Sequence, residues 1–169
     1  MSPTGEGVQS PRTLPSKEEG GRGVPSILIV DDHAFIRRGI RSILQDSPDW
    51  NVSGEAENGR DAVRLAKELK PDVILMDVSM PGMTGLEATR LIRQNNPKAK
   101  VVLLTLHDSR ELVRSAFQVG VNGYLLKTDA ERELMRALAV VTEEGTYASP
   151  KIDAELVKKA MAERGERLP

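Results

Sequence analysis

The chain has 169 residues, a formal net charge of −1 and no cysteine, and 39% of its residues are hydrophobic. This length predicts one domain with appended segments, large enough to bury a core of its own. The small net charge argues against a surface that binds nucleic acid over its whole extent, and the lack of cysteine excludes disulfides and thiolate metal sites. No apolar run is long enough for a membrane span or a secretory signal, so we expect a cytoplasmic protein.

The first segment, residues 1–25, contains five Gly, four Pro and three Ser. Such a segment cannot bury enough apolar area to offset its chain entropy, so we predict that it is disordered.

Five runs of β-favouring residues then alternate with five amphipathic helical patterns. The predicted strands are residues 26–30, 51–56, 73–77, 100–105 and 121–126. The predicted helices are His33 to Gln45, one from the N-cap Asn58 to just before Pro71, Thr84 to Gln94, one from the N-cap Asp108 to Val119 with Gly120 as its C′ residue, and one from the N-cap Asp129 to about Glu144. Such alternation with short connections predicts a flavodoxin-like (βα)5 fold, a doubly wound parallel sheet with strand order 2-1-3-4-5, over residues 26–145.

The last segment, residues 146–169, carries a helical apolar face. Its members are Ile152, Leu156, Val157, Ala160 and Met161. One interpretation is a linker helix that packs on the domain or on a second copy, and the other is a frayed stub. Five Lys or Arg against four Asp or Glu in residues 151–169 do not form a basic stripe for DNA.

Acidic residues follow the two strands that flank the crevice of this fold. Asp31 and Asp32 follow the first strand, and Asp77 ends the third. Three neighbouring carboxylates repel unless a cation lies among them, and hard oxygen ligands favour Mg²⁺ or Mn²⁺. A flavin or nucleotide site would instead need a Gly-rich loop after the first strand, where this chain has Asp31-Asp32-His33.

The fourth and fifth strands end in a hydroxyl and an ammonium group, those of Thr105 and Lys127. Taken singly, each strand-end residue also has an ordinary explanation, such as a helix cap for Asp77 or a solvated charge for Lys127. Taken together, they provide an acid pair, a lone carboxylate, a hydroxyl donor and a cation. A carboxylate can form an acyl phosphate, and phosphoryl transfer mainly needs positioning and charge neutralisation.

In these motifs the chain resembles the receiver domain of response regulators in two-component systems, from about Ser26 to Glu144. The motifs are Ile29-Val30-Asp31-Asp32, the run from Leu75 to Gly85, Leu104-Thr105, and Gly123-Tyr124-Leu125-Leu126-Lys127. The last motif, with Gly-Thr-Tyr-Ala-Ser-Pro at 145–150, is similar to the NarL/FixJ subclass. Many receivers have Pro after the strand-5 Lys, where this chain has Thr128. The subclass usually carries a helix-turn-helix domain after a linker, and we expect none before Pro169.

The resemblance implies that Asp77 accepts phosphate from a sensor histidine kinase. It also implies that Asp32, Asp77 and the backbone carbonyl of Ser79 bind Mg²⁺ directly, while Asp31 helps through water. Lys127 would pair with the phosphoryl group.

The resemblance further implies that Thr105 donates a hydrogen bond to the phosphoryl group and that Tyr124 turns inward as the Thr105 hydroxyl moves. Ser79 and His107 would flank the path of the hydrolytic water and tune dephosphorylation, although His107 can equally be a solvated loop residue.

We therefore expect a signalling switch and no enzyme, most simply the receiver part of a transcriptional regulator that reaches DNA through a downstream domain. One alternative is a stand-alone receiver that acts by protein–protein interaction. The other is an aspartyl-nucleophile phosphatase, which would carry its nucleophile in Asp-x-Asp after the first strand.

The expected output surface is the helix from Asp108, the fifth strand and the helix from Asp129. The last of these carries Glu131, Arg132, Glu133 and Arg136. This mixed charge is either an ordinary solvated face or the contact of a homodimer that tightens on phosphorylation.

Overall fold

A computed structural model describes residues 23–167, with side chains described up to Arg164. The disorder predicted for residues 1–25 falls mainly on residues 1–22, which lie outside the described residues. The described chain forms one six-stranded parallel sheet with the order β2-β1-β3-β4-β5-β6. The strands are β1 (Ser26–Val30), β2 (Asn51–Ala56), β3 (Val73–Asp77), β4 (Lys100–Thr105), β5 (Gly123–Leu126) and β6 (Tyr147–Ala148). The flavodoxin-like fold and the order of the five predicted strands are confirmed.

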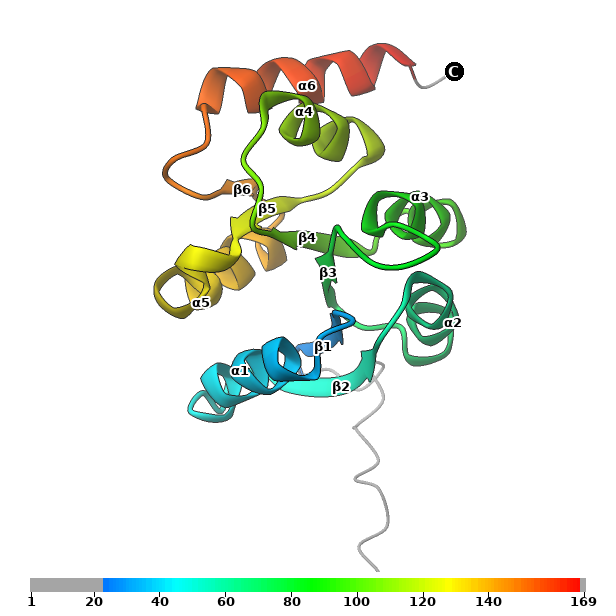
Figure 1. Cartoon of the computed structure of the whole chain (residues 1–169), viewed down its shortest axis with the longest axis vertical. Helices are drawn as coiled ribbons and strands as arrows, with labels where there is room; N and C mark the ends of the chain where they lie inside the picture. The colour runs from blue at the N-terminus through cyan, green and yellow to red at the C-terminus, as the bar shows by residue number, and fades with distance from the viewer. Residues whose placement is uncertain (1–22, 168–169) are drawn as a thin grey trace, which may run out of the picture.

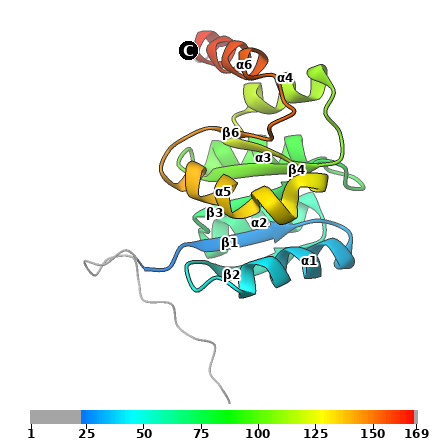
Figure 2. The same cartoon turned by 90° about the vertical axis from the view of Figure 1, so that its left-hand side faces the viewer.

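Helices cover both faces of the sheet (Figure 1). They are α1 (Ala34–Gln45), α2 (Gly59–Leu69), α3 (Gly85–Asn95), α4 (Arg110–Val119), α5 (Ala130–Thr142) and α6 (Ala154–Arg167), with a short 3₁₀ turn η1 (Lys127–Asp129) before α5. One core layer lies between the sheet and α1 and α5, and the other lies between the sheet and α2, α3 and α4 (Figure 2). This arrangement leaves the carboxyl ends of the strands as the edge where side chains from several strands can meet.

Successive side chains of β1 point to opposite faces of the sheet and so contribute to both core layers. Ile27 and Ile29 join the layer under α1 and α5, whereas Leu28 and Val30 join the opposite layer. Every residue of β1 and of β3 is buried, which is why both strands read as continuous apolar runs rather than as alternating ones.

Of the three predicted N-caps, Asn58 is confirmed, and the other two make no capping hydrogen bond. Asn58 and Thr84 accept hydrogen bonds from the backbone amides of their first turns, Thr84 within a capping box. The prediction that Asp108 caps α4 is wrong, because the hydroxyl of Ser109 accepts the hydrogen bond from Leu112 N–H instead. Asp129 makes no capping hydrogen bond either, because η1 precedes α5 and gives Asp129 a helical backbone. Each difference moves the helix start by one residue or inserts a single turn.

The structured unit continues after α5. Tyr147 and Ala148 pair in parallel with Gly123 and Tyr124 as β6, a strand too short to show a sequence pattern. Residues 154–167 form α6, which packs along α4, so the interpretation of a helix packed on the domain is the one that the structure shows (Figures 1 and 2). The partition of the chain at residue 145 stays a prediction.

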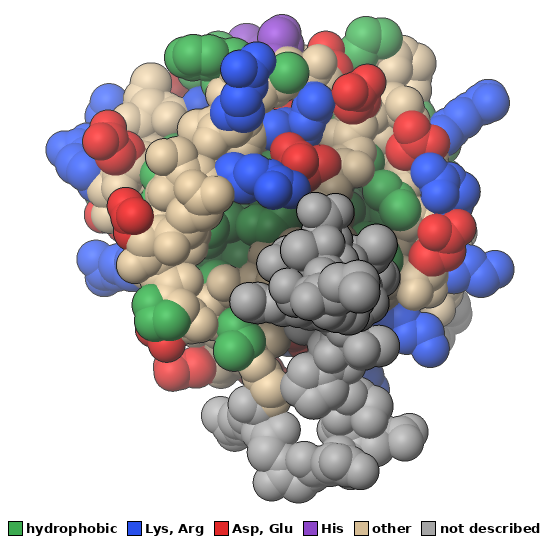
Figure 3. All heavy atoms as spheres, turned by 90° about the horizontal axis from the view of Figure 1, so that it is seen from below, with side chains coloured by type: hydrophobic (Ala, Val, Ile, Leu, Met, Phe, Trp, Pro, Cys, Tyr) green, Lys and Arg blue, Asp and Glu red, His purple; other side chains and the backbone are tan. Residues whose placement is uncertain are grey.

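Charges of both signs are mixed on the face of the molecule at the β2 end of the sheet (Figure 3). Figure 3 shows Lys and Arg side chains interspersed with Asp and Glu on the face at the β2 end of the sheet, without a one-sign patch. Among the described helices, none has the length and apolar composition that a membrane crossing requires.

Candidate functional site

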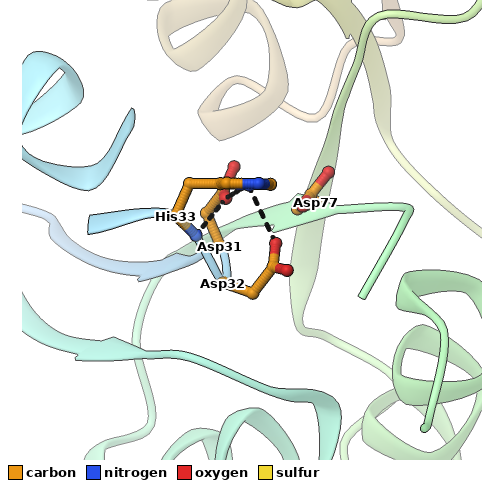
Figure 4. A group of neighbouring side chains, drawn as sticks. All are labelled: Asp31, Asp32, His33 and Asp77. Atoms are coloured by element: carbon orange, nitrogen blue, oxygen red, sulfur yellow. Dashed lines mark hydrogen bonds and ion pairs between the residues drawn. The ribbon is translucent and has the colours of Figure 1, made fainter. Parts of the chain in front are cut away.

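The acidic residues meet because their strands are neighbours in register. Val30 of β1 pairs with Met76 of β3, so Asp31 and Asp77, one residue further on, reach the edge of the sheet side by side. Asp31 is fully buried and Asp77 is 2% exposed. Asp32 and His33 complete the group, and one potential ligand atom from each of the four residues lies within 4.8 Å of the others (Figure 4).

His33 lies over two of the carboxylates. Its Nδ1 is 3.1 Å from Oδ1 of Asp31 and 3.0 Å from Oδ1 of Asp32, and its backbone N–H donates to Asp31 at 2.8 Å (Figure 4). No contact between His33 and these acids was predicted from the sequence. The sequence did contain a signal for this contact. His33 directly follows the two acids at the end of β1 and lies in the turn into α1, so its side chain is close to both carboxylates.

Lys127 connects the two buried carboxylates. Thr105 of β4 pairs with Leu126 of β5, so the next residue, Lys127, reaches the same edge of the sheet. Its Nζ lies 3.0 Å from Oδ2 of Asp31 and 3.2 Å from Oδ1 of Asp77. The Lys127 side chain is only 13% exposed, so both ion pairs are largely removed from water.

Burial and charge shift the pKa of both partners. Burial raises the pKa of Asp77, the Asp31 carboxylate raises it further, and Lys127 together with the Ser79 backbone amide offsets only part of the rise. Burial alone would lower the pKa of Lys127, but its contacts with Asp31 and Asp77 outweigh that effect and raise it. Lys127 therefore stays charged at neutral pH, and the site holds more negative charge than one ammonium group compensates.

The unsatisfied oxygens of the acids fit a hard cation. Among the described residues, Oδ2 of Asp77 is buried without a hydrogen bond. Oδ2 of Asp31 and Oδ1 of Asp32 also lack hydrogen bonds and have only ion-pair contacts, with Lys127 and His33. Buried carboxylate oxygens are costly to leave unpaired, and oxygen-rich sites of this kind suit Mg²⁺ or Mn²⁺. The residues present therefore fit the ion.

The loop after β3 is fixed by a close backbone approach. A Cβ atom at Gly85 would stand 2.0 Å from the carbonyl oxygen of Asp77, and the Gly85 N–H donates to the Val78 carbonyl at 2.9 Å. Gly82 within this loop has φ +76°, which favours glycine. These constraints hold Ser79, whose side chain is exposed, directly beside the acidic group.

Thr105 and Tyr124 both bind the segment that leads into α4. The Thr105 hydroxyl accepts a hydrogen bond from His107 N–H at 3.0 Å, and the Tyr124 hydroxyl donates to the His107 carbonyl at 2.5 Å. Tyr124 is fully buried and stacks on Phe117 of α4 with ring centroids 6.4 Å apart. The inward position expected of Tyr124 only after phosphorylation is thus already adopted. The His107 side chain is exposed.

The structure therefore brings together most of the predicted site. Asp31, Asp32, Asp77 and Lys127 form one connected group, and Ser79 joins it through its backbone amide. Thr105 ends the strand next to β3 and faces the same edge. Tyr124 and His107 are linked to the site through Thr105. The His107 N–H donates to the Thr105 hydroxyl, and the Tyr124 hydroxyl donates to the His107 carbonyl.

Comparison with known proteins agrees with this geometry. The family model of the response regulator receiver domain matches residues 27–139. The chain is 41% identical over 133 residues to the transcriptional regulatory protein DegU of Brevibacillus brevis, covering 79% of this chain and 56% of that protein. It is 41% identical over 134 residues to the response regulator GacA of Pseudomonas aeruginosa, covering 79% and 63%. The chain thus spans about three fifths of the length of these curated relatives.

Solved structures give the same answer. A two-component response regulator of the LuxR family from Aurantimonas sp. SI85-9A1 superposes with a TM-score of 0.74 at 32% identity, covering 85% of this chain and 99% of that one. Receiver domains as a class are signalling modules that work with histidine kinases and bind Mg²⁺ in an acidic pocket. With its sheet order, its strand-end acids and a family match over residues 27–139, the chain belongs to the response regulator receiver domain family, among relatives of the NarL/LuxR type.

Proposed function

We propose that Asp77 is the residue of this chain that accepts a phosphoryl group. The supporting observation is the state of its carboxylate: Oδ1 contacts the Lys127 ammonium at 3.2 Å, and the buried Oδ2 has no hydrogen bond among the described residues. An oxygen of Asp77 attacks phosphorus, the bond from phosphorus to the donor histidine nitrogen breaks, and an acyl phosphate forms while that nitrogen keeps the electron pair.

Asp32, Asp77 and the Ser79 carbonyl would hold Mg²⁺ or Mn²⁺, with Asp31 acting through water. The ion, when bound, neutralises negative charge on the phosphoryl oxygens. Lys127 would bind a phosphoryl oxygen, and its raised pKa keeps it positively charged. The Thr105 hydroxyl, which accepts from His107 N–H, still has its own proton to donate to the phosphoryl group.

Ser79 and His107 have exposed side chains beside the site and behind Thr105. We assign them to the approach of the hydrolytic water, so that they set the lifetime of the phosphorylated state. Because both side chains are exposed, substitutions of Ser79 or His107 can change the rate of hydrolysis without altering the buried core.

The decisive experiment is intact mass after treatment with acetyl phosphate and Mg²⁺. Wild type should gain one phosphate, and Asp77→Asn should gain none. Asp46→Asn is the matched control, because Asp46 is exposed at the end of α1, away from the site. Equal labelling of Asp77→Asn and wild type would refute the assignment, and labelling without Mg²⁺ would refute the role of the metal.

A histidine kinase is the proposed donor, and two exposed apolar side chains mark where it would dock. Phe35 in the first turn of α1 is 81% exposed, and Leu106, directly after Thr105, is 66% exposed. We expect Phe35→Ser to slow transfer from a phosphorylated kinase without changing labelling by acetyl phosphate. Leu91→Ser on α3, 37% exposed, is the control. Equal slowing in both variants would contradict this docking surface. A donor of this kind would place the chain in the cytoplasm.

We propose signalling rather than catalysis, because the lone acid Asp77 ends β3 and the adjacent pair Asp31 and Asp32 follows β1, unlike the Asp-x-Asp pattern of aspartyl phosphatases. Turnover of phosphomonoesters by the purified protein would reverse this view. Control of transcription is the proposed output, through a DNA-binding domain outside this chain. DegU, a transcriptional regulatory protein by name, supports this. The alternative is a receiver that acts by protein–protein contact alone.

We also propose a homodimer through the exposed face of α5. Two of the four charged residues expected to form its contact, Glu133 and Arg132, already have partners within the chain. The Tyr147 hydroxyl donates to Glu133, and Arg132 contacts Asp129 at 3.3 Å. Glu131 and Arg136 are exposed and remain able to pair with a second copy. Sedimentation velocity with Mg²⁺ should show a monomer–dimer equilibrium that shifts toward dimer with beryllofluoride, and an unchanged monomer at high concentration would refute it.

A further inference from the structure

Helix α6 covers a face of α4 that belongs to the expected output surface. The two helices run side by side at the end of the molecule opposite β2 (Figures 1 and 2). Ile152, Val157 and Ala160 are 8%, 6% and 1% exposed, and they share one apolar cluster with residues of α4. The α4 face is therefore a helix-binding surface, and α6 is its tethered occupant.

Polar contacts hold both ends of α6 on the same face of α4. Arg114 donates through Nε and Nη2 to the two carboxylate oxygens of Glu163 at 3.0 and 2.9 Å, and Gln118 donates to Glu163 as well. At the other end, Arg110 contacts Asp153 at 3.1 Å. The three α4 donors are spaced by four residues, which places them on one side of the helix.

Several weak interactions of opposite sign determine how firmly α6 packs on α4. The ion pairs lie at the surface, where each contributes little. Two guanidinium groups also lie close to one point: atoms of Arg93 and Arg164 lie 3.2 and 3.5 Å from the position that a Cβ of Gly120 would take. Burial and then the charge of Arg164 lower the pKa of Arg93, as expected for like charges in proximity. Such a contact can be released by a modest change in α4.

The site of Asp77 connects to this contact through a short path. Thr105 holds His107 N–H, Tyr124 holds the His107 carbonyl, and α4 begins only three residues later at Arg110. Tyr124 also stacks on Phe117 within α4. A shift of Thr105 toward a phosphoryl group therefore pulls on the first turn of α4, whose Arg110 holds Asp153.

We propose that phosphorylation releases α6 from α4 and uncovers the apolar strip between Arg110 and Gln118. This inference rests on the proposed function, because it needs a phosphoryl group on Asp77. Coupling between two sites is reciprocal, so a substitution that loosens α6 must also strengthen binding of a phosphoryl mimic. In a helix that is merely weakly packed, loosening α6 would leave the affinity for the phosphoryl mimic unchanged, so this affinity distinguishes the two cases.

Amide hydrogen exchange of residues 154–164, with Mg²⁺ and with or without beryllofluoride, tests the release. In wild type the mimic should speed exchange about tenfold, within the range usual for allosteric coupling. Asp77→Asn should show no response. Glu163→Gln, which removes the charge held by Arg114, should exchange fast without the mimic and bind beryllofluoride more tightly. Glu155→Gln is the matched control, because Glu155 is an exposed α6 carboxylate that contacts Lys158 of its own helix at 3.7 Å.

Intact mass after acetyl phosphate separates the two ideas. One added phosphate together with unchanged or slower exchange in α6 overturns the release and leaves the proposed function standing. No added phosphate overturns both. Glu163→Gln that exchanges fast yet binds beryllofluoride no more tightly than Glu155→Gln also overturns the coupling, since reciprocity would then be violated.

Discussion

The ammonium group of Lys127 lies 3.2 Å from Oδ1 of Asp77 and 3.0 Å from Oδ2 of Asp31, so one buried cation serves two buried carboxylates from different strands. Removing it takes the Lys127 ion pair from both acids and leaves Asp31 the contacts of His33 and Asp77 the Ser79 backbone amide. Breaking a buried pair in this way typically costs about 3–5 kcal/mol. We expect Lys127→Gln to lose somewhat less, about 2 kcal/mol of unfolding free energy, because the site opens to solvent at one edge.

Urea unfolding with and without Mg²⁺ measures this loss. Mg²⁺ should restore most of the stability of Lys127→Gln, because it replaces the missing positive charge among the acids. Lys98→Gln, at an exposed position, should match wild type in both conditions. A Lys127→Gln protein as stable as wild type without Mg²⁺ would contradict the bridging role of Lys127.

Asp32→Asn should weaken Mg²⁺ binding, because one proposed carboxylate ligand is lost. Without the metal it should be as stable as wild type or more so, since repulsion among the acids falls. Asp32 is less buried than Asp31, with a side chain 24% exposed, so the gain should be small. Thermal melts over a Mg²⁺ titration give both quantities, and unchanged Mg²⁺ affinity would exclude Asp32 as a ligand.

Tyr124→Phe removes the hydrogen bond to the His107 carbonyl and leaves the buried ring in place. We expect a loss of about 1 kcal/mol in unfolding free energy. Exchange should also speed in residues 106–109, which lose their anchor. Tyr147→Phe is a matched control, since its hydroxyl contacts Glu133 instead. It should cost a similar amount and leave residues 106–109 unchanged, and identical exchange in both variants would contradict the anchoring role.

Acid should release α6 from α4. Arg110 lowers the pKa of Asp153, and Arg114 and Gln118 outweigh the opposing effect of burial to lower that of Glu163. Because these folded-state pKa values lie below the unfolded ones, the docking contribution is complete above about pH 5 and is lost as pH falls through the folded-state values.

Backbone NMR signals of residues 154–164 between pH 6 and pH 3 would follow this release. The groups that face the two acids are Arg110, Arg114 and Gln118 on α4 and, on α6 itself, Lys159 beside Glu163 and the backbone amides of Glu155 and Leu156 beside Asp153. Glu163→Gln should remove part of the response and Glu155→Gln none of it. Signals that stay unchanged down to pH 3 would show that these ion pairs do not hold α6.

The sequence predicted the five main strands and the acidic site because both depend on short-range signals. A buried parallel strand reads as an apolar run, and Asp31, Asp77, Thr105 and Lys127 each stand at the end of such a run. Once the strand order is fixed, parallel register brings these ends to one edge. Helix caps were less certain, because Asp108 and Ser109 are equally good candidates by residue type and only backbone geometry selects Ser109.

The tertiary structure alone decided three relationships. It placed His33 over Asp31 and Asp32, seated the Tyr124 hydroxyl on the His107 carbonyl, and laid α6 along α4. The apolar face of the last segment showed that a helix could pack there, but not against what. Its partner depends on where Arg110 and Arg114 stand relative to Asp153 and Glu163, residues at least 43 positions apart in the chain. Contacts between such distant residues arise from the packed fold, because nothing in the local periodicity of either helix specifies its neighbour.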